Sequence, residues 1–315
     1  MGQEVQTGIL TYYIAGPTAS GKTQIAVELA KLIDGEVISA DSAQIYKHMD
    51  IGSAKPTKDE MQGIRHHLID VLNPDEEYSA AMFQKMARAA ADDIKRRGKT
   101  PIIAGGSGFY LNALLYGVDF YPNEPDKNGR EKYMQIAYKY GNIYLHSLLR
   151  AKDPEAAVTI HPNNVKRVIR ALLFYDETGM KMSLHNEEEA RKRAPEDARL
   201  FVLSMSRPLL YERIDQRTGN MFCRGLVNEV QRLIEMGYDE HLTSMQAIGY
   251  KETIDYLKNR CTLDDAKEKI KRATRHLAKR QITWYKHKCD GVWVDAGNIQ
   301  LLDLIDMAKT SNLWK

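Results

Sequence analysis

The sequence contains only three cysteines among its 315 residues, Cys223, Cys261 and Cys289. Their spacing matches neither a CxxC redox pair nor the paired ligands of a zinc knuckle. A disulfide-rich scaffold is therefore excluded, and the chain has to fold around its own hydrophobic core. Its composition allows this, because 43% of the residues are hydrophobic, as in ordinary soluble domains. We expect the three cysteines to be reduced thiols in a cytoplasmic protein.

Long hydrophobic runs are absent as well. A helix that crosses a bilayer needs about 20 consecutive apolar residues, and no segment of the chain approaches that length. The first ten residues, MGQEVQTGIL, lack the basic start and the apolar segment of a secretory signal. We therefore expect no membrane partner and a cytoplasmic location.

The chain also lacks a strong charge of either sign, because its formal net charge is only +3. The distribution of charge is more informative. Residues 267–288, KEKIKRATRHLAKRQITWYKHK, are dense in Lys, Arg and His. Basic residues beside aromatic ones suit contact with nucleic-acid phosphates and bases. A solvated helix face is the usual explanation of such a run, and the run alone does not decide between the two.

Short β-type runs alternate with helical patterns in the first third of the chain. Strands are predicted at 11–16, 35–41 and 100–106, and helices at 22–33 and 79–99. Two further β-type runs occupy 198–205 and 291–296. This alternation is typical of an α/β fold in which helices cover a parallel sheet. Residues 121–196 show no convincing strand, so we predict a core of 1–120 and 197–315 with a helical insertion domain at 121–196.

The most specific motif follows the first predicted strand. Residues 16–23 read GPTASGKT and match G-x-x-x-x-G-K-[ST] between a strand and a helix. In such a loop, glycines let successive N–H groups point at phosphate oxygens, and the helix dipole adds to the attraction. The predicted phosphate-binding residues are Gly16, Pro17, Thr18, Ala19, Ser20, Gly21, Lys22 and Thr23. The Thr23 hydroxyl is the predicted magnesium ligand. The motif indicates a diphosphate or a nucleotide, without deciding between kinase, ATPase and other chemistry.

An acidic residue, Asp41, follows the second predicted strand. The carboxyl ends of parallel strands meet at one edge of the sheet, so Asp41 is expected beside the phosphate loop. An Asp-Ser pair is also a common capping or turn element. Position alone supports a catalytic carboxylate and a local turn equally.

Seven segments together resemble the tRNA dimethylallyltransferase (tRNA isopentenyltransferase) family. In chain order they are GPTASGKT, DSAQIYKHMDIGSAKP, HHLID, GGSGFYLNALL, VIRALLFYDETG, QAIGYKE and AKRQITW, between about residues 12 and 286. The resemblance implies a P-loop NTPase-like parallel sheet core with an inserted helical domain and C-terminal helices. It implies transfer of a dimethylallyl group from dimethylallyl diphosphate to N6 of an adenosine. That adenosine lies on the 3′ side of the anticodon, in tRNAs that read codons beginning with U.

The same resemblance implies roles for individual residues. The phosphate loop holds the prenyl donor's diphosphate, with Lys22, Thr23 and Mg²⁺ beside it. Arg217 is the first choice for an arginine that clamps the diphosphate, and Arg213 the second. Asp41 becomes the base that accepts the proton of the attacking amine, and Tyr110 is a candidate lining of an apolar slot for the prenyl tail.

The partner implied on the other side is the tRNA anticodon stem-loop, bound by a protein that we expect to be a monomer. Its implied contacts come from four groups of residues. They are Asp41, Ser42, Ala43, Gln44 and Ser107; Lys166, Arg167, Val168, Ile169 and Arg170; Gln246, Gly249, Tyr250 and Lys251; and Lys279, Arg280 and Gln281. Helical spacing places Lys166, Arg167 and Arg170 within reach of one face.

Adjacent histidines at 66 and 67 suggest a metal site at first sight. On an extended segment they point to opposite faces, so we assign no metal to them and expect one to form a hydrogen bond near the donor site. Three rival functions remain at this point. They are a small-molecule phosphate-loop kinase, an adenylate isopentenyltransferase that prenylates a free nucleotide, and an RNA-binding protein with a degenerate phosphate loop.

Overall fold

The computed structural model describes residues 8–120, 127–297, 303 and 305–306. The chain forms two compact units, one of residues 1–115 and 195–315 and one of residues 116–194. The second unit overlaps the range 121–196, for which a helical insertion domain is predicted. The predicted boundary at residue 121 and the N-terminal residues 1–7 lie outside the described residues.

The first unit contains a parallel sheet. Within the described residues it has six strands, in the order β3-β2-β4-β1-β5-β6, and every pairing is parallel. The strands are β1 Thr11–Ala15, β2 Gly35–Ser39, β3 His66–His67, β4 Thr100–Ala104, β5 Ala198–Ser204 and β6 Val292–Asp295. All five strands predicted from the sequence are present, which confirms the α/β class. The two-residue strand β3 at the edge was not predicted.

Helices cover this sheet and make up the second unit. In the first unit they are α1 Lys22–Leu32, α2 Lys58–Met61, α3 Ala80–Arg96, α4 Gly108–Leu115, α10 Arg207–Cys223, α11 Leu226–Glu235, α12 Tyr250–Leu257 and α13 Leu263–Lys288. In the second unit they are α5 Lys127–Tyr140, α6 Asn142–Lys152, α7 Pro154–Thr159, α8 Val165–Thr178 and α9 Met182–Ala190. None of the helices in the described part of the chain is long and apolar enough to cross a membrane.

Each unit has its own hydrophobic core. In the first, Ile14, Ile102 and Phe201 from neighbouring strands pack with Leu29 of α1. These central strands are buried along nearly their whole length, which is why they read as continuous apolar runs. In the second unit, buried apolar residues of α6 and α8 pack together, including Leu149 and Leu172. The three cysteines are free, as expected.

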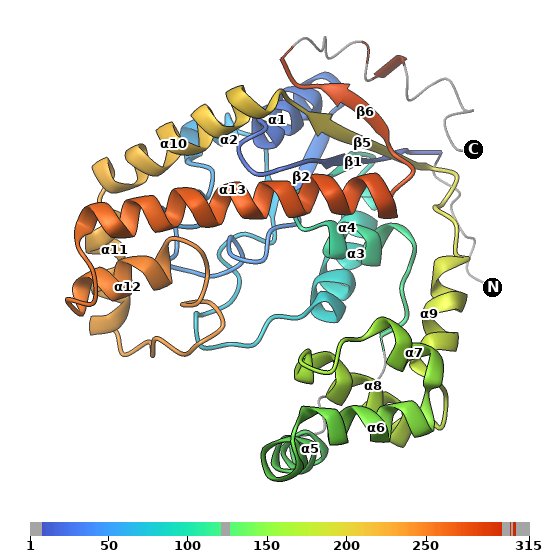
Figure 1. Cartoon of the computed structure of the whole chain (residues 1–315). Helices are drawn as coiled ribbons and strands as arrows, with labels where there is room; N and C mark the ends of the chain where they lie inside the picture. The colour runs from blue at the N-terminus through green and yellow to red at the C-terminus, as the bar shows by residue number, and fades with distance from the viewer. Residues whose placement is uncertain (1–7, 121–126, 298–302, 304, 307–315) are drawn as a thin grey trace. The chain divides into compact units, whose positions relative to one another are not determined.

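The sheet topology determines where a ligand can bind. Because β1, β2 and β4 are parallel neighbours, the segments that follow them meet at one edge of the sheet. These segments carry the phosphate loop, Asp41 and the glycine turn at Gly105–Gly106. The long helices α10 and α13 pack against each other (Figure 1), and both contribute side chains to this edge.

Candidate functional site

The phosphate loop runs from the end of β1 to the start of α1. Gly16 has a φ of +142°, and a Cβ there would lie 2.9 Å from the carbonyl oxygen of Leu203. Gly21, the residue before α1, has a φ of +89°. Side chains rarely adopt these backbone angles, so glycine is required at both positions. The loop therefore has the curled backbone that its sequence predicts, at the N-terminus of an eleven-residue helix.

Lys22 extends back over this loop. Its Nζ donates a hydrogen bond to the carbonyl oxygen of Pro17 at 2.6 Å. Although the residue as a whole is half-buried, the pKa of Lys22 is lowered to about 7. Burial of the ammonium is the main cause, the charge of Arg217 lowers it further, and Asp41 partly offsets both. An anion placed in the loop would restore the charged state of Lys22.

Two side chains from α10 and α13 reach the same loop. The Nη1 of Arg217 donates to the Thr18 hydroxyl at 3.2 Å. The backbone N–H of Thr18 donates to Oε1 of Gln281 at 2.8 Å, and Nε2 of Gln281 donates to the carbonyl oxygen of Gly106 at 2.8 Å. Gln281 therefore bridges the phosphate loop and the glycine turn after β4.

Asp41 lies at the end of β2 and is half-buried. Its Oδ1 accepts a hydrogen bond from the backbone N–H of Ala43 at 2.9 Å, so Asp41 does stabilise a local turn. This bond leaves further acceptor capacity on the carboxylate. The Asp41 charge also acts on the pKa values of both Lys22 and Arg217, which places the acid and the cations in one electrostatic unit.

A single cavity of about 750 Å³ connects these groups. That is within the range of sites for small organic ligands. All its lining residues belong to the first unit. The predicted site residues among them are Thr18, Ala19, Gly21, Lys22, Thr23, Asp41, Gln44, Arg213, Arg217 and Gln281. The cavity has an anion-binding end and a carboxylate, which is the arrangement needed to stabilise a phosphate leaving group while accepting a proton elsewhere.

The other predicted base-reading residues come from the same two segments as Asp41 and the glycine turn. Gln44 is held at both ends of its amide, because Oε1 accepts from the Ser39 hydroxyl at 2.9 Å and Nε2 donates to the carbonyl oxygen of Ala54 at 3.2 Å. Ser42 is exposed, and Ser107 is half-buried at the N-terminus of α4. These residues come from the segments after β2 and β4 and stay predictions as RNA contacts.

Several predicted tRNA-contacting side chains are exposed on helices. Lys166, Arg167 and Arg170 are exposed on α8 of the second unit, as their helical spacing predicts. Gln246 and Lys251 are exposed near the start of α12, and Lys279 and Arg280 are exposed on α13. Their positions are compatible with phosphate contacts.

Four other predicted RNA contacts require correction. Val168 and Ile169 are 0% and 3% exposed in the core of the second unit, and Tyr250 is 0% exposed. Gly249 is buried as well. The side chains of Val168, Ile169 and Tyr250 therefore present no surface to an RNA, because the apolar face of each helix packs inward. Gly249 has no side chain to offer. Gln281 points its amide at the phosphate loop and acts within the cavity wall.

The histidine pair has a structural role. Nε2 of His67 lies 2.8 Å from Oε2 of Glu36, and Nδ1 of His66 lies 2.9 Å from the carbonyl oxygen of Ile64. Neither lines the cavity, so the expected hydrogen bond exists but not at the donor site. Tyr110 is stacked on Phe83 with ring centroids 4.8 Å apart and is likewise not part of the cavity lining.

The sequence analysis missed the role of the glycines after β4. A Cβ on Gly106 would lie 2.4 Å from Nε2 of Gln281, and a Cβ on Gly108 would lie 2.2 Å from Cε3 of Trp284. The GGSG turn therefore needs glycine at these positions, because α13 packs directly on it. The signal in the sequence is the joint occurrence of two glycines in one motif and a bulky Gln-x-x-Trp pair in another.

Comparison with known proteins agrees with this geometry. The IPP transferase family model matches residues 44–288. The tRNA dimethylallyltransferase of Lachnoclostridium phytofermentans is 48% identical over 281 residues, which are 89% of this chain and 90% of that protein. The tRNA dimethylallyltransferase of Acetivibrio thermocellus is 49% identical over 283 residues, 90% of each.

Two solved structures are also similar. The full-length tRNA isopentenylpyrophosphate transferase from Bacillus halodurans gives a TM-score of 0.70 at 39% identity, over 95% of this chain and 94% of that one. A structure of a eukaryotic dimethylallyltransferase acting on tRNA gives a TM-score of 0.78 at 32% identity, over 91% of this chain and 73% of that one. The suspected resemblance is confirmed, and the chain belongs to the IPP transferase family.

Proposed function

We propose that this protein transfers a dimethylallyl group from dimethylallyl diphosphate to N6 of an adenosine in tRNA. The target is the adenosine on the 3′ side of the anticodon in tRNAs that read codons beginning with U. The observation that carries the proposal is one cavity that joins a phosphate loop, two arginines and Asp41. Membership of the IPP transferase family supports tRNA as the acceptor.

The anion-binding end of the cavity suits the diphosphate of the donor. When the allylic C–O bond breaks, its electron pair leaves with the diphosphate and negative charge grows on the departing oxygens. Donors that already point at this position lower the barrier without reorganising. The loop N–H groups and Lys22 supply such donors, together with Arg217 as the first choice of clamp and Arg213 as the second.

We propose Mg²⁺ as the cofactor and Thr23 as its protein ligand. Thr23 is exposed at the first turn of α1 and lines the cavity. Across the described residues, no group of three or more His, Cys, Asp or Glu is arranged to hold a metal ion. Magnesium usually binds few protein groups together with substrate phosphates and water, so a hydroxyl beside a phosphate loop fits it. The ion, when bound, neutralises charge on the diphosphate.

Asp41 serves the acceptor. The N6 amine attacks C1 of the dimethylallyl group, the N–C bond forms as the C–O bond breaks, and the nitrogen becomes acidic. The Asp41 carboxylate accepts the proton that N6 then loses. It also accepts a hydrogen bond from the amine beforehand, which orients the nitrogen toward the donor.

The adenine has to leave its stack to reach this carboxylate. Gln44 lines the same cavity as Asp41, and Ser107 follows the neighbouring strand β4. We assign both to reading the edges of an unstacked base, as is usual for loop nucleotides in RNA. The exposed basic residues of α8 and α13 supply phosphate contacts, which are independent of base identity.

The decisive experiment compares acceptors. Purified protein is mixed with Mg²⁺, labelled dimethylallyl diphosphate and either unmodified tRNA or free AMP. Label in tRNA alone is the expected result, and cleavage of that tRNA to nucleosides should give N6-dimethylallyladenosine. Label in AMP would assign the protein to the nucleotide-prenylating enzymes. Transfer of phosphate from ATP to a small molecule, with no prenylation, would assign it to the kinases.

We also propose that the protein acts as a monomer in the cytoplasm, where tRNA is modified. Light scattering at the concentrations of the assay tests this, and a dimer mass would refute it.

A further inference from the structure

One wall of the cavity is a segment without regular secondary structure, residues 46–55, which we call the 46–55 loop. Its residues Ile51, Ala54 and Lys55 line the cavity. The carbonyl oxygen of Ala54 accepts the Gln44 amide at 3.2 Å, and Gln44 lies three residues after Asp41. The position of the loop therefore affects the acceptor end of the cavity.

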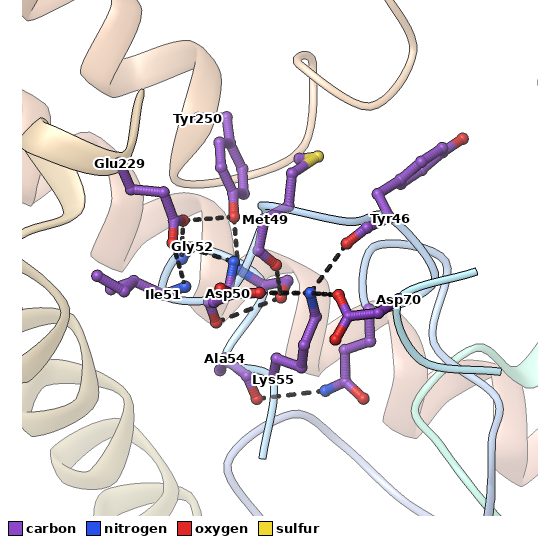
Figure 2. A network of polar contacts seen from close by, with 12 residues as sticks. Tyr46, Met49, Asp50, Ile51, Gly52, Ala54, Lys55, Asp70, Glu229 and Tyr250 are labelled. Carbon is purple, nitrogen blue, oxygen red and sulfur yellow. Dashed lines mark hydrogen bonds and ion pairs between the residues drawn. The ribbon is translucent and has the colours of Figure 1, made fainter. Parts of the chain in front are cut away.

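A buried carboxylate from α11 holds this loop. Glu229 is 1% exposed. Its Oε2 accepts from the backbone N–H groups of Asp50 at 3.0 Å and Ile51 at 2.8 Å. Its Oε1 accepts from the N–H of Gly52 at 3.1 Å and from the Tyr250 hydroxyl at 2.8 Å (Figure 2). Three successive N–H groups that converge on one anion form a nest, and here the anion is built into the protein.

Tyr250 of α12 completes the contact. It is 0% exposed, and its hydroxyl oxygen accepts from the N–H of Ser53 at 3.2 Å. A Cβ on Gly52 would lie 2.5 Å from Cε2 of the Tyr250 ring, so only glycine permits this approach. Burial and the neighbouring Glu229 hold the pKa of Tyr250 well above its usual value, and the hydroxyl keeps its proton to donate.

Lys55 fixes the other side of the loop. It is 6% exposed, and its Nζ donates to the carbonyl oxygen of Tyr46 at 2.9 Å and to the carboxylates of Asp50 and Asp70, both at 2.5 Å (Figure 2). This anchor lies within the N-terminal part of the chain. The Glu229–Tyr250 contact is different, because it connects the loop to helices some 180 residues later.

Those helices are continuous with the donor end of the cavity. Helix α11 packs against α10 and α12, and α12 packs against α13. Helix α10 carries Arg217, and α13 carries Gln281, which touch the phosphate loop. Glu229 and Tyr250 therefore connect the wall beside the acceptor base to the helices that contact the diphosphate loop.

We propose that Glu229 and Tyr250 are positioning residues that set the 46–55 loop, and through Gln44 the base subsite, for the acceptor tRNA. Neither lines the cavity, so they act on the substrate through the loop. The inference rests on the proposed function for the identity of the acceptor. The donor diphosphate contacts are assigned to other residues, Lys22, Arg217 and Arg213, so we expect the pair to act mainly on the acceptor.

The test uses Glu229→Gln and Tyr250→Phe in the full chain. Glutamine keeps the shape but replaces one acceptor oxygen with an NH₂ group that faces N–H donors. We expect KM for tRNA to rise about tenfold or more, as for loss of a hydrogen bond to a buried charge. KM for dimethylallyl diphosphate should change less than about twofold. The matched control is Glu235→Gln, on the same helix but exposed, which should leave both values unchanged.

Amide hydrogen exchange supplies a readout that does not need turnover. Protection of the N–H groups of Asp50, Ile51 and Gly52 should fall about tenfold or more in both variants, while the control stays as wild type. Because Glu229 and Tyr250 share one hydrogen bond, their effects on KM for tRNA should be less than additive in the double variant.

The outcomes separate cleanly. If exchange at 50–52 rises while KM for tRNA stays at the wild-type value, the loop does not position the acceptor and the inference is wrong. If kcat and thermal stability fall with both KM values unchanged, the pair only stabilises the fold, which also overturns it. If the wild type prenylates no tRNA, the proposed function fails, and tRNA affinity measured by fluorescence anisotropy then replaces KM. Equal affinity of wild type and Tyr250→Phe would refute the positioning role.

Discussion

The lowered pKa of Lys22 predicts that diphosphate binding depends on pH in a specific way. Without ligand, Lys22 donates to Pro17 at 2.6 Å and has a pKa of about 7, mainly because burial disfavours its charge and Arg217 lies nearby. A bound diphosphate brings several negative charges to the same loop and favours the ammonium. Binding above pH 7 therefore requires uptake of a proton.

The size of the effect follows from the pKa. At pH 7 about half of the Lys22 side chains are already charged, whereas at pH 9 only about 1% are. The dissociation constant for diphosphate should therefore rise by up to about fiftyfold between these pH values, or about 2.3 kcal/mol. This is an upper bound, because Lys22 is half-buried and water screens part of its surroundings. The direction of the Lys22 contribution is fixed, since its charged form is the one that binds.

Isothermal titration calorimetry with inorganic diphosphate tests this. Titrations at pH 8 in two buffers of different ionisation enthalpy should show uptake of up to about 0.9 proton per diphosphate bound. The matched variant is Lys22→Arg, which remains charged throughout this range and should lose this component. Protons that diphosphate itself gains or loses contribute equally to both proteins, so they cancel when the variant is compared with the wild type. Equal proton uptake in the two proteins would show that Lys22 is already charged before the ligand arrives.

Three further changes test the site and the fold. Asp41→Asn keeps an acceptor for the N–H of Ala43 but removes the base, so kcat should fall about 100-fold or more. The affinity for tRNA should stay within about threefold of the wild-type value. A large loss of both kcat and tRNA affinity would contradict the base assignment. Glu36, whose side chain is 6% exposed, has a pKa lowered to about 2, first by its hydrogen bonds to Arg97. Ionised Glu36 stabilises the fold above pH 4.5, and this contribution to the free energy of unfolding, up to about 3 kcal/mol, should be lost between about pH 4.5 and 2. Urea unfolding of wild type and Glu36→Gln at pH 6 and pH 3 checks this. An equal loss of stability in the two proteins would refute it. Lys279→Ala should reduce the salt dependence of tRNA binding by about one unit of slope, and an unchanged slope would remove Lys279 from the phosphate contacts.

The sheet and the phosphate loop were predictable because local patterns encode them. Buried parallel strands read as apolar runs, and the loop needs glycine at particular backbone angles, as at Gly16 and Gly21. The position of Asp41 followed from topology alone, since parallel strands end at one edge. The strand β3 escaped notice because two residues, His66 and His67, carry no periodicity.

The orientation of single side chains was not predictable in the same way. Tyr250 follows directly after Gly249 in a motif rich in polar residues, and nothing local indicates that its ring packs on a glycine almost 200 residues earlier. Gln281 directly follows two exposed basic residues, Lys279 and Arg280, yet its amide turns toward the phosphate loop. Helix periodicity gives the face of a residue, but only the packing of the helix decides what that face meets.

The same contacts connect motifs that lie far apart in this sequence. Gly106 accommodates Gln281, and Gly52 accommodates Tyr250. Each pair joins a small residue in a loop at the sheet edge to a large residue on a C-terminal helix, so neither member can change alone without a clash or a void. The helices α12 and α13 thereby hold two walls of the cavity, the glycine turn and the 46–55 loop. A motif that is distant in sequence from the phosphate loop is therefore part of the same site through packing.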